Sequence, residues 1–93
     1  MVSCLVQSSF IVANIKGLHT RPSTELVRCA SSFKANISLT NRNLTVDAKS
    51  LLGVLILSAA RGAKIRVEAE GIDAENAVEA ILDLAKHQFY ISY

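Results

Sequence analysis

Residues 64–70 read Lys-Ile-Arg-Val-Glu-Ala-Glu, the clearest alternation of apolar and charged side chains in the chain. Successive side chains of a strand point to opposite faces, so Ile65, Val67 and Ala69 would share one face and the charged residues the other. This pattern predicts a β-strand in a sheet that has one face in water and the other covered by helices.

Further segments with strand character precede this one. Residues 36–40 alternate polar and apolar side chains, and residues 44–46 predict the return strand of a hairpin. The turn between them, at residues 41–43, contains two asparagines, which can adopt positive φ. The first strand is expected at residues 5–13, because that segment is rich in Val, Ile and Phe.

Three helices are predicted from changes of hydrophobic period and from helix-start residues. The first begins at Thr20, where apolar residues start to recur at helical spacing and Pro22 falls in the first turn. The second begins after Ser50, a natural N-cap, and ends at residues 61–62, where a glycine stands near the C-cap. Asp73 is expected to cap the third helix.

The resulting order of elements is β-α-β-β-α-β-α. We interpret it as an α+β fold in which a four-stranded antiparallel sheet is covered on one face by three helices. The pattern leaves the strand order open, because a ferredoxin-like sheet has nearly the same order of elements. The length of 93 residues predicts a single domain over residues 1–93.

Composition argues against several classes of protein. Hydrophobic residues make up 51% of the chain, and the net charge is +2. The apolar fraction argues against intrinsic disorder, and the small net charge argues against a nucleic-acid binder. The most apolar run, residues 51–60, is shorter than the about 20 residues that a membrane-spanning helix needs.

The N-terminal segment and the cysteines indicate a compartment. No Lys or Arg precedes Lys16, and polar residues interrupt the first apolar stretch, so a signal peptide is not expected. Cys4 and Cys29 form no C-x-x-C motif and are expected to be free thiols, with a disulfide between them as the alternative. We therefore expect a cytoplasmic protein.

Residues 17–22, which read Gly-Leu-His-Thr-Arg-Pro, hold the side chains that could carry chemistry. His19 would stand at or next to the N-cap, beside free backbone amides that bind phosphate and other anions. Arg21 could offer a planar set of donors to phosphoryl oxygens. On spacing alone, a histidine that only caps the helix is the favoured interpretation. No Cys, Asp or Glu stands at ligand spacing from His19, so neither a metal nor another cofactor is predicted.

Two motifs resemble those of the HPr family, the phosphocarrier proteins of the bacterial phosphoenolpyruvate-dependent phosphotransferase system. The first is Gly-Leu-His-Thr-Arg-Pro-Ser at residues 17–23, and the second is Lys-Ser-Leu-Leu-Gly-Val at residues 49–54. The resemblance extends from about Phe10 to Leu84, with a few extra residues at each end. It implies the open-faced β-sandwich of that family.

The resemblance also implies a phosphoryl relay. In the family, enzyme I passes a phosphoryl group from phosphoenolpyruvate to the histidine of the carrier, which hands it to a IIA domain. By resemblance, His19 would accept the group at Nδ1, Arg21 would orient and neutralise it, and the amides of Thr20 and Arg21 would help to hold it. The chain would then be a stoichiometric carrier and not an enzyme.

A docking face and a regulatory residue follow from the same resemblance. The docking face would have an apolar centre on the second predicted helix and a basic rim, made up of Leu51, Leu52, Leu55, Arg21, Arg28 and Lys49. Ser50 resembles the serine that a dedicated HPr serine kinase/phosphorylase modifies in many bacteria, although a plain helix cap would also explain it. The expected partners are enzyme I, IIA domains and this kinase, with no nucleic acid and no membrane insertion, and the expected state is a monomer.

The chain departs from the family pattern outside its His-Arg-Pro core. Ser58 stands where many members have glycine, which we expect to tighten or shift the end of the second helix. Lys16 stands where a small polar residue is frequent. Two alternatives stay open: a carrier of a regulatory phosphorelay that feeds no sugar permease, and a ferredoxin-like module that binds a ligand or a protein, with His19 in a structural role.

Overall fold

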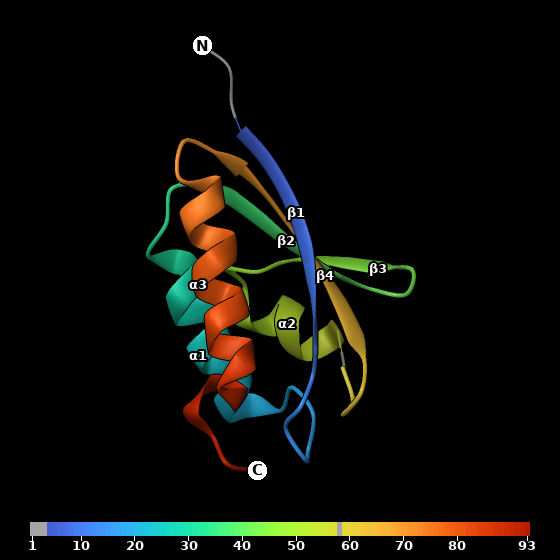
Figure 1. The fold of residues 1–93 in the computed structure, drawn as a ribbon. Coiled ribbons are helices and arrows are strands. Elements are labelled where there is room, and N and C mark those ends of the chain that lie inside the picture. Colours follow the sequence, from blue (N-terminus) through green and yellow to red (C-terminus); the bar gives the residue numbers. More distant parts are fainter. Residues whose placement is uncertain (1–3, 58) are drawn as a thin grey trace.

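A four-stranded antiparallel sheet with helices on one of its faces forms the framework of the molecule (Figure 1). The computed structural model describes residues 4–57 and 59–93. In chain order the elements are β1 (Cys4–Ile11), α1 (Thr20–Ser31), β2 (Asn36–Asn41), β3 (Leu44–Asp47), α2 (Leu51–Leu57), β4 (Lys64–Gly71), α3 (Ala74–Lys86) and the short 3-10 turn η1 (Gln88–Tyr90). The predicted α+β fold and the order β-α-β-β-α-β-α are confirmed.

The strand order, which the pattern left open, is β1-β4-β2-β3. The last strand in the sequence, β4, therefore lies between β1 and β2 and pairs antiparallel with both. Its side chains alternate as predicted: Ile65, Val67 and Ala69 are fully buried, whereas Lys64 and Arg66 are exposed on the opposite face. The uncovered face of the sheet is thus polar because β4 presents its charged side chains there.

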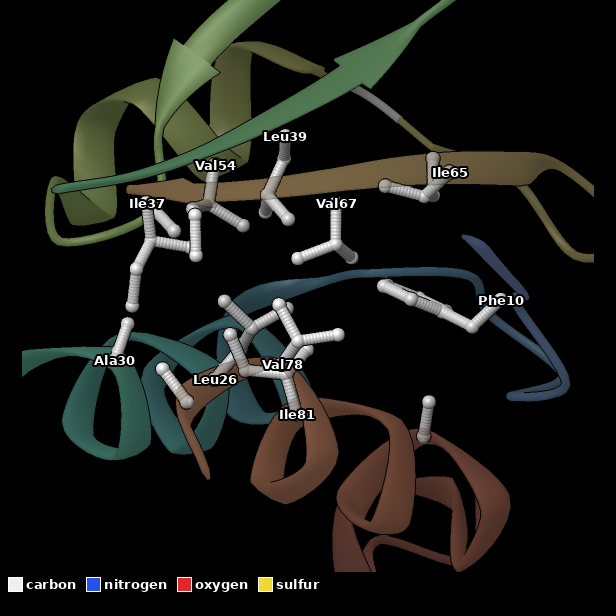
Figure 2. Close-up of a cluster of buried hydrophobic side chains, with 14 of the residues drawn as sticks. Phe10, Leu26, Ala30, Ile37, Leu39, Val54, Ile65, Val67, Val78 and Ile81 are labelled. Carbon is white, nitrogen blue, oxygen red and sulfur yellow. The ribbon is translucent and has the colours of Figure 1, made fainter. Parts of the chain in front are cut away.

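The core lies between the inner face of the sheet and the helices. In Figure 2, Leu39 and Val67 of the sheet face Leu26 of α1 and Ile81 of α3, and all four side chains are fully buried. Burying an aliphatic side chain of this size contributes about 1.5–3 kcal/mol, so these contacts fix the helices against the sheet. The first strand adds Phe10, whose ring packs edge to face against the ring of Phe89 near the C-terminal end.

The end of the second helix differs from its prediction. α2 ends at Leu57, not at residues 61–62, and Ser58 lies outside the described residues. The chain after the helix is instead tied to the loop that follows β1, because Leu18 donates its amide to the Ala59 oxygen at 2.8 Å. Gly62 adopts positive φ in the turn before β4, where its amide donates to Val12.

Two strand boundaries also differ. β1 ends at Ile11, two residues before the predicted end, and the main chain of Val12 bonds instead to Gly62 and Ala63 in the turn before β4. In the hairpin, Asn41 still pairs with Leu44, so only the two residues between them form the turn. The positive φ therefore falls on Arg42, at 57°, and not on an asparagine as predicted.

Asp73 occupies the N-cap position of α3 but makes no side-chain hydrogen bond to that helix. Its carboxylate instead accepts hydrogen bonds from the main-chain amides of Lys34 and Ala35, both at 2.8 Å. The prediction that this residue caps its helix is therefore wrong for the side chain, which ties α3 to the loop between α1 and β2. The hydrogen bond from the Lys34 amide is the largest influence holding the pKa of Asp73 below its ordinary value.

Both cysteines are free thiols, as expected. Burial raises the pKa of the Cys29 thiol, which keeps it protonated and less reactive. Among the helices of the described residues, none has the length and apolarity required to span a bilayer.

Candidate functional site

The loop between β1 and α1 places His19 at the start of a helix. Gly17 adopts φ +71°, and a Cβ at this position would collide with the main-chain oxygen of Ala59. A glycine is therefore required for the loop to approach the segment after α2. Leu18 is buried at the next position and anchors the loop in the core.

His19 is the N-cap residue of α1 by position, as predicted, but its imidazole does not cap the helix. Its backbone is extended, its main-chain oxygen accepts the amide of Ser23 at 3.0 Å, and its side chain makes no capping hydrogen bond. Pro22 lies in the first turn, where it displaces no helical hydrogen bond. The imidazole is consequently not used to stabilise α1.

The imidazole of His19 contacts Tyr93 near the C-terminal end of the chain. Its Nε2 lies 3.0 Å from the main-chain oxygen of Tyr93, and the two rings are stacked with centroids 5.3 Å apart. An oxygen of this kind only accepts hydrogen bonds, so Nε2 must carry the proton. In the neutral ring, Nδ1 is then the nitrogen with the free lone pair.

The tyrosine also brings Arg21 to the site. Nη1 of Arg21 donates to the hydroxyl of Tyr93 at 2.6 Å, and the guanidinium carbon lies 5.7 Å from the centre of the ring. The ammonium group of Lys16 lies 5.4 Å from the same ring centre. Two cations and an imidazole thus surround one aromatic side chain. Because Arg21 is exposed, its guanidinium can turn toward an anion bound at His19.

Asn14 holds the chain that carries Tyr93. Its Nδ2 donates to the main-chain oxygens of Gln88, Ile91 and Tyr93 at 3.0, 2.9 and 3.3 Å, and its side chain is fully buried. Figure 1 shows the C-terminal end beside the loop that precedes α1. Phe89 is fully buried as well and meets Phe10 edge to face, with ring centroids 6.0 Å apart.

Tyr93 and Asn14 were both missed by the sequence reasoning. They lie outside the two motifs, and a hydrogen bond between residues more than 70 positions apart leaves no periodic signal in the sequence. The apolar Phe89 directly after a helix end is the one hint that this segment packs back on the domain.

The surface of α2 is divided between core and solvent. Val54 and Leu57 are buried. Leu52 is 68% exposed, Leu51 is 38% exposed, and Leu55 is half-buried. Ile56, which the sequence reasoning passed over, is 54% exposed. Ile56 lies four residues after Leu52, so the two share one face of the helix, and the helical period could have predicted this from the sequence.

The basic residues around α2 have partners within the chain. Nζ of Lys49 donates to the main-chain oxygen of Phe33 at 2.7 Å, and Arg28 lies 3.5 Å from Glu25 one turn earlier in α1. The structure therefore joins His19 and Arg21 directly through Tyr93. Arg28 lies in α1 and Lys49 just before α2, and the partners described for them are Glu25 and Phe33.

Ser50 stabilises the start of α2 in the way that the sequence predicts. Its hydroxyl oxygen accepts a hydrogen bond from the amide of Gly53 at 3.0 Å. The residue is half-buried, so the hydroxyl is both in contact with the helix and partly open to solvent.

The chain is similar to known phosphocarriers over most of its length. Residues 6–87 match the family described as "PTS HPr component phosphorylation site". The phosphocarrier protein HPr of Xylella fastidiosa (strain 9a5c) is 36% identical over 85 residues, which are 91% of this chain and 96% of that protein. The phosphoryl donor subunit DhaM of the PEP-dependent dihydroxyacetone kinase of Providencia stuartii is 38% identical over 88% of this chain and 17% of its own length.

Solved structures of HPr proteins are also similar to this chain. The crystal structure of HPr-C-His from Thermoanaerobacter tengcongensis superposes with a TM-score of 0.90 and 33% identity, covering 95% of this chain and 99% of that one. HPr from Bacillus anthracis str. Ames superposes with a TM-score of 0.82 and 36% identity, covering 86% of this chain and 95% of that one. Sequence and fold therefore agree over nearly the whole chain, and the protein belongs to the HPr family of phosphocarrier proteins of the phosphotransferase system.

Proposed function

We propose that this chain accepts a phosphoryl group from phosphorylated enzyme I on Nδ1 of His19 and transfers it to a IIA domain. The observation that carries the proposal is the hydrogen bond between Nε2 of His19 and the oxygen of Tyr93, which leaves Nδ1 unprotonated in the neutral ring. An unprotonated imidazole nitrogen on a half-buried residue at a helix start is a competent nucleophile. The relay would take place in the cytoplasm, with the chain acting as a monomeric carrier and not as an enzyme.

The reaction requires little of the protein beyond placement and charge. The lone pair of Nδ1 forms a bond to phosphorus while the bond from phosphorus to the donor group of enzyme I breaks. Arg21, with the amides of Thr20 and Arg21, would balance the negative charge of the phosphoryl oxygens at the start of α1. Transfer to the IIA domain is the reverse process, in which Nδ1 recovers its lone pair.

The docking face is proposed at α2. Leu51 and Leu52 are exposed there, and Leu55 is half-buried beside them. An apolar centre that excludes water and a basic rim are typical of protein interfaces, and the rim acts mainly on the rate of association. The rim would comprise Arg21, Arg28 and Lys49, of which Lys49 and Arg28 must leave or share their present partners.

Ser50 is proposed as a regulatory phosphorylation site for a serine kinase/phosphorylase. A phosphate there would add a charge of about −1.5 to −2 next to Lys49 and the exposed leucines. That charge would oppose an acidic partner and slow phosphorylation of His19. Ser50→Asp should reproduce part of this effect at low salt, where the repulsion is least screened. A rate equal to the wild-type rate would remove Ser50 from the regulation.

The proposal is tested by incubating the full chain with phosphoenolpyruvate and catalytic enzyme I. We expect one acid-labile, base-stable phosphate per chain, assigned to Nδ1 of His19 by phosphorus NMR. Absence of this phosphate would overturn the carrier function and favour a binding module. A second candidate is a relay that serves no sugar permease, which the similarity to the DhaM phosphoryl donor subunit favours. Transfer to a panel of IIA domains distinguishes the two.

A further inference from the structure

We propose that Tyr93 is a positioning residue that closes on His19 and Arg21 in the unphosphorylated protein, and thereby makes the phosphorylated protein a stronger phosphoryl donor. The inference deepens the proposed function and rests on it. Tyr93 contacts both residues: its main-chain oxygen lies 3.0 Å from Nε2 of His19, and its hydroxyl lies 2.6 Å from Nη1 of Arg21.

The segment that carries Tyr93, residues 88–93, is held against the domain by specific contacts. Gln88, Phe89 and Tyr90 have φ of 53°, 55° and 58°, a left-handed conformation that is costly for residues other than glycine. Such a run persists only where surrounding contacts outweigh its strain. Burial of Phe89 and the three hydrogen bonds from Asn14 supply those contacts. We call residues 88–93 the strap.

Tyr93, at the tip of the strap, competes with a phosphoryl group for the guanidinium of Arg21. In the closed arrangement, the neutral hydroxyl of Tyr93 accepts a hydrogen bond from Nη1 of Arg21. A phosphoryl group on His19 would carry negative charge and several acceptor oxygens, and a guanidinium prefers such a partner to a hydroxyl. Arg21 would therefore turn to the phosphoryl group, and the bond to Tyr93 would be lost. The base of the strap can remain in place, because Phe89 packs on Phe10 and Asn14 binds main-chain oxygens of the strap itself.

A contact made in one state of an equilibrium shifts that equilibrium toward the same state. The bond between Tyr93 and Arg21 belongs to the unphosphorylated state, so it stabilises the protein after the phosphoryl group has left. The closed strap thus favours delivery to the next protein and disfavours loading. Removal of the tyrosine ring should have the opposite effect and increase retention of the phosphoryl group.

The test is a competition between two carriers for one pool of phosphoryl groups. Equal amounts of wild type and Tyr93→Ala are mixed with catalytic enzyme I and with phosphoenolpyruvate equivalent to half of the total carrier. Intact-mass spectrometry then gives the phosphorylated fraction of each chain at equilibrium. We expect the ratio of phosphorylated to unphosphorylated protein to be about tenfold higher for Tyr93→Ala, which corresponds to about 1.4 kcal/mol.

Two further variants identify the group responsible. Tyr93→Phe keeps the ring on His19 and loses the hydroxyl, so it should show a smaller increase in the same direction. Tyr90→Phe is the matched control, because Tyr90 is exposed and stacks on His87. It should partition equally with wild type. Thermal unfolding of each variant confirms that the fold is retained.

The outcomes separate this inference from the proposed function. Absence of phosphate on every chain contradicts the carrier function itself. Normal loading with equal partition between wild type and Tyr93→Ala contradicts the role of Tyr93 alone, as does a lower phosphorylated fraction for the variant. In wild type, the ring signals of Tyr93 should also shift in NMR spectra when His19 is phosphorylated. Unchanged signals would contradict the loss of the bond between Tyr93 and Arg21.

Discussion

Two helices of this protein begin with a polar residue and use it differently. Ser50 precedes α2, and its hydroxyl accepts the amide of Gly53 at 3.0 Å. His19 precedes α1, yet its imidazole makes no hydrogen bond to the helix and contacts Tyr93 instead. A position before a helix therefore does not decide what its side chain does. The hydroxyl stabilises its own helix, whereas the imidazole is available for reaction.

The difference follows from reach and from neighbours. A serine hydroxyl stays close to its own backbone and meets the free amides of the first turn. The longer imidazole extends past those amides, and the strap offers it an acceptor on the other side. Substitutions at the two helix starts should consequently change different properties: at α1 the phosphoryl transfer, and at α2 the stability.

The largest effect is expected for His19→Ala, which should abolish phosphate acceptance. The unfolding free energy should change by only about 1 kcal/mol, because the variant loses one hydrogen bond and the stacking on Tyr93 but no helix cap. Acid-labile phosphate and urea unfolding measure the two properties. Residual phosphate on the variant would contradict the assignment of His19, and a large loss of stability would contradict the distinction between the two helix starts.

Arg21→Ala should slow transfer to and from His19 without unfolding the protein. Loss of a charge-assisted hydrogen bond costs about 1.5–3 kcal/mol, or roughly ten- to hundredfold in rate. Rapid-quench measurement of the phosphorylation rate tests this. Arg28→Ala is the matched control, because Arg28 is an exposed arginine of the same helix that lies against Glu25. Equal slowing of both variants would mean that Arg21 acts only as a rim charge.

Leu52→Glu should weaken docking of enzyme I about tenfold, because it places a charge in the apolar centre of the proposed docking face. The KM for the carrier in the enzyme I reaction reports the change. Ile72→Glu is the control, since Ile72 is equally apolar, is 78% exposed and lies between β4 and α3. If the two variants behave alike, the exposed face of α2 is not the docking surface.

Ser50→Ala should leave phosphate acceptance intact and lower the unfolding free energy by about 1 kcal/mol, because the Gly53 amide loses its capping partner. For a domain of this size, such a loss lowers Tm by roughly 4–8 °C. Ser50→Thr supplies the control, as it keeps a capping hydroxyl. An unchanged Tm for the alanine variant would show that the cap contributes nothing, and the contrast with His19 would disappear.

The smallest effect concerns the third helix start, where Asp73 binds the amides of Lys34 and Ala35. The hydrogen bond from the Lys34 amide is the main cause of a lowered pKa for this carboxyl, whose ordinary value is 3.8. A lowered pKa means that the stability is present in full above the ordinary value and is lost as the pH falls through the lowered one. The wild type should be more stable than Asp73→Asn at pH 7, and the difference should shrink below pH 3.8. A difference that is independent of pH would contradict the role of the charge.

Much of the fold could be predicted because its signals are local. The alternation at Ile65, Val67 and Ala69 predicted a strand with one buried face, and all three side chains are fully buried. The expected start at Thr20 is the first residue of α1. The predicted ends of elements were less accurate. The end of α2, for example, depends on the contact between Ala59 and the loop before α1.

The site was predictable only in part. Residues 17–22 identified His19 and Arg21, because a histidine and an arginine near a helix start form a short pattern that the resemblance made specific. The same pattern could not distinguish a histidine that caps its helix from one that bonds another segment, because both stand at the same position. The path of the strap makes that distinction.

The sequence by itself determined the class of the fold, the order of its elements and the position at a helix start of His19, the proposed phosphoryl acceptor. Periodicity, turn residues and short motifs act over a few residues, and they survive in the unfolded chain as patterns. The tertiary structure alone decided that β4 lies between β1 and β2, that Asp73 binds another loop, and that Tyr93 covers His19. These contacts join residues as many as 74 positions apart, and they exist only after the core has brought the segments together.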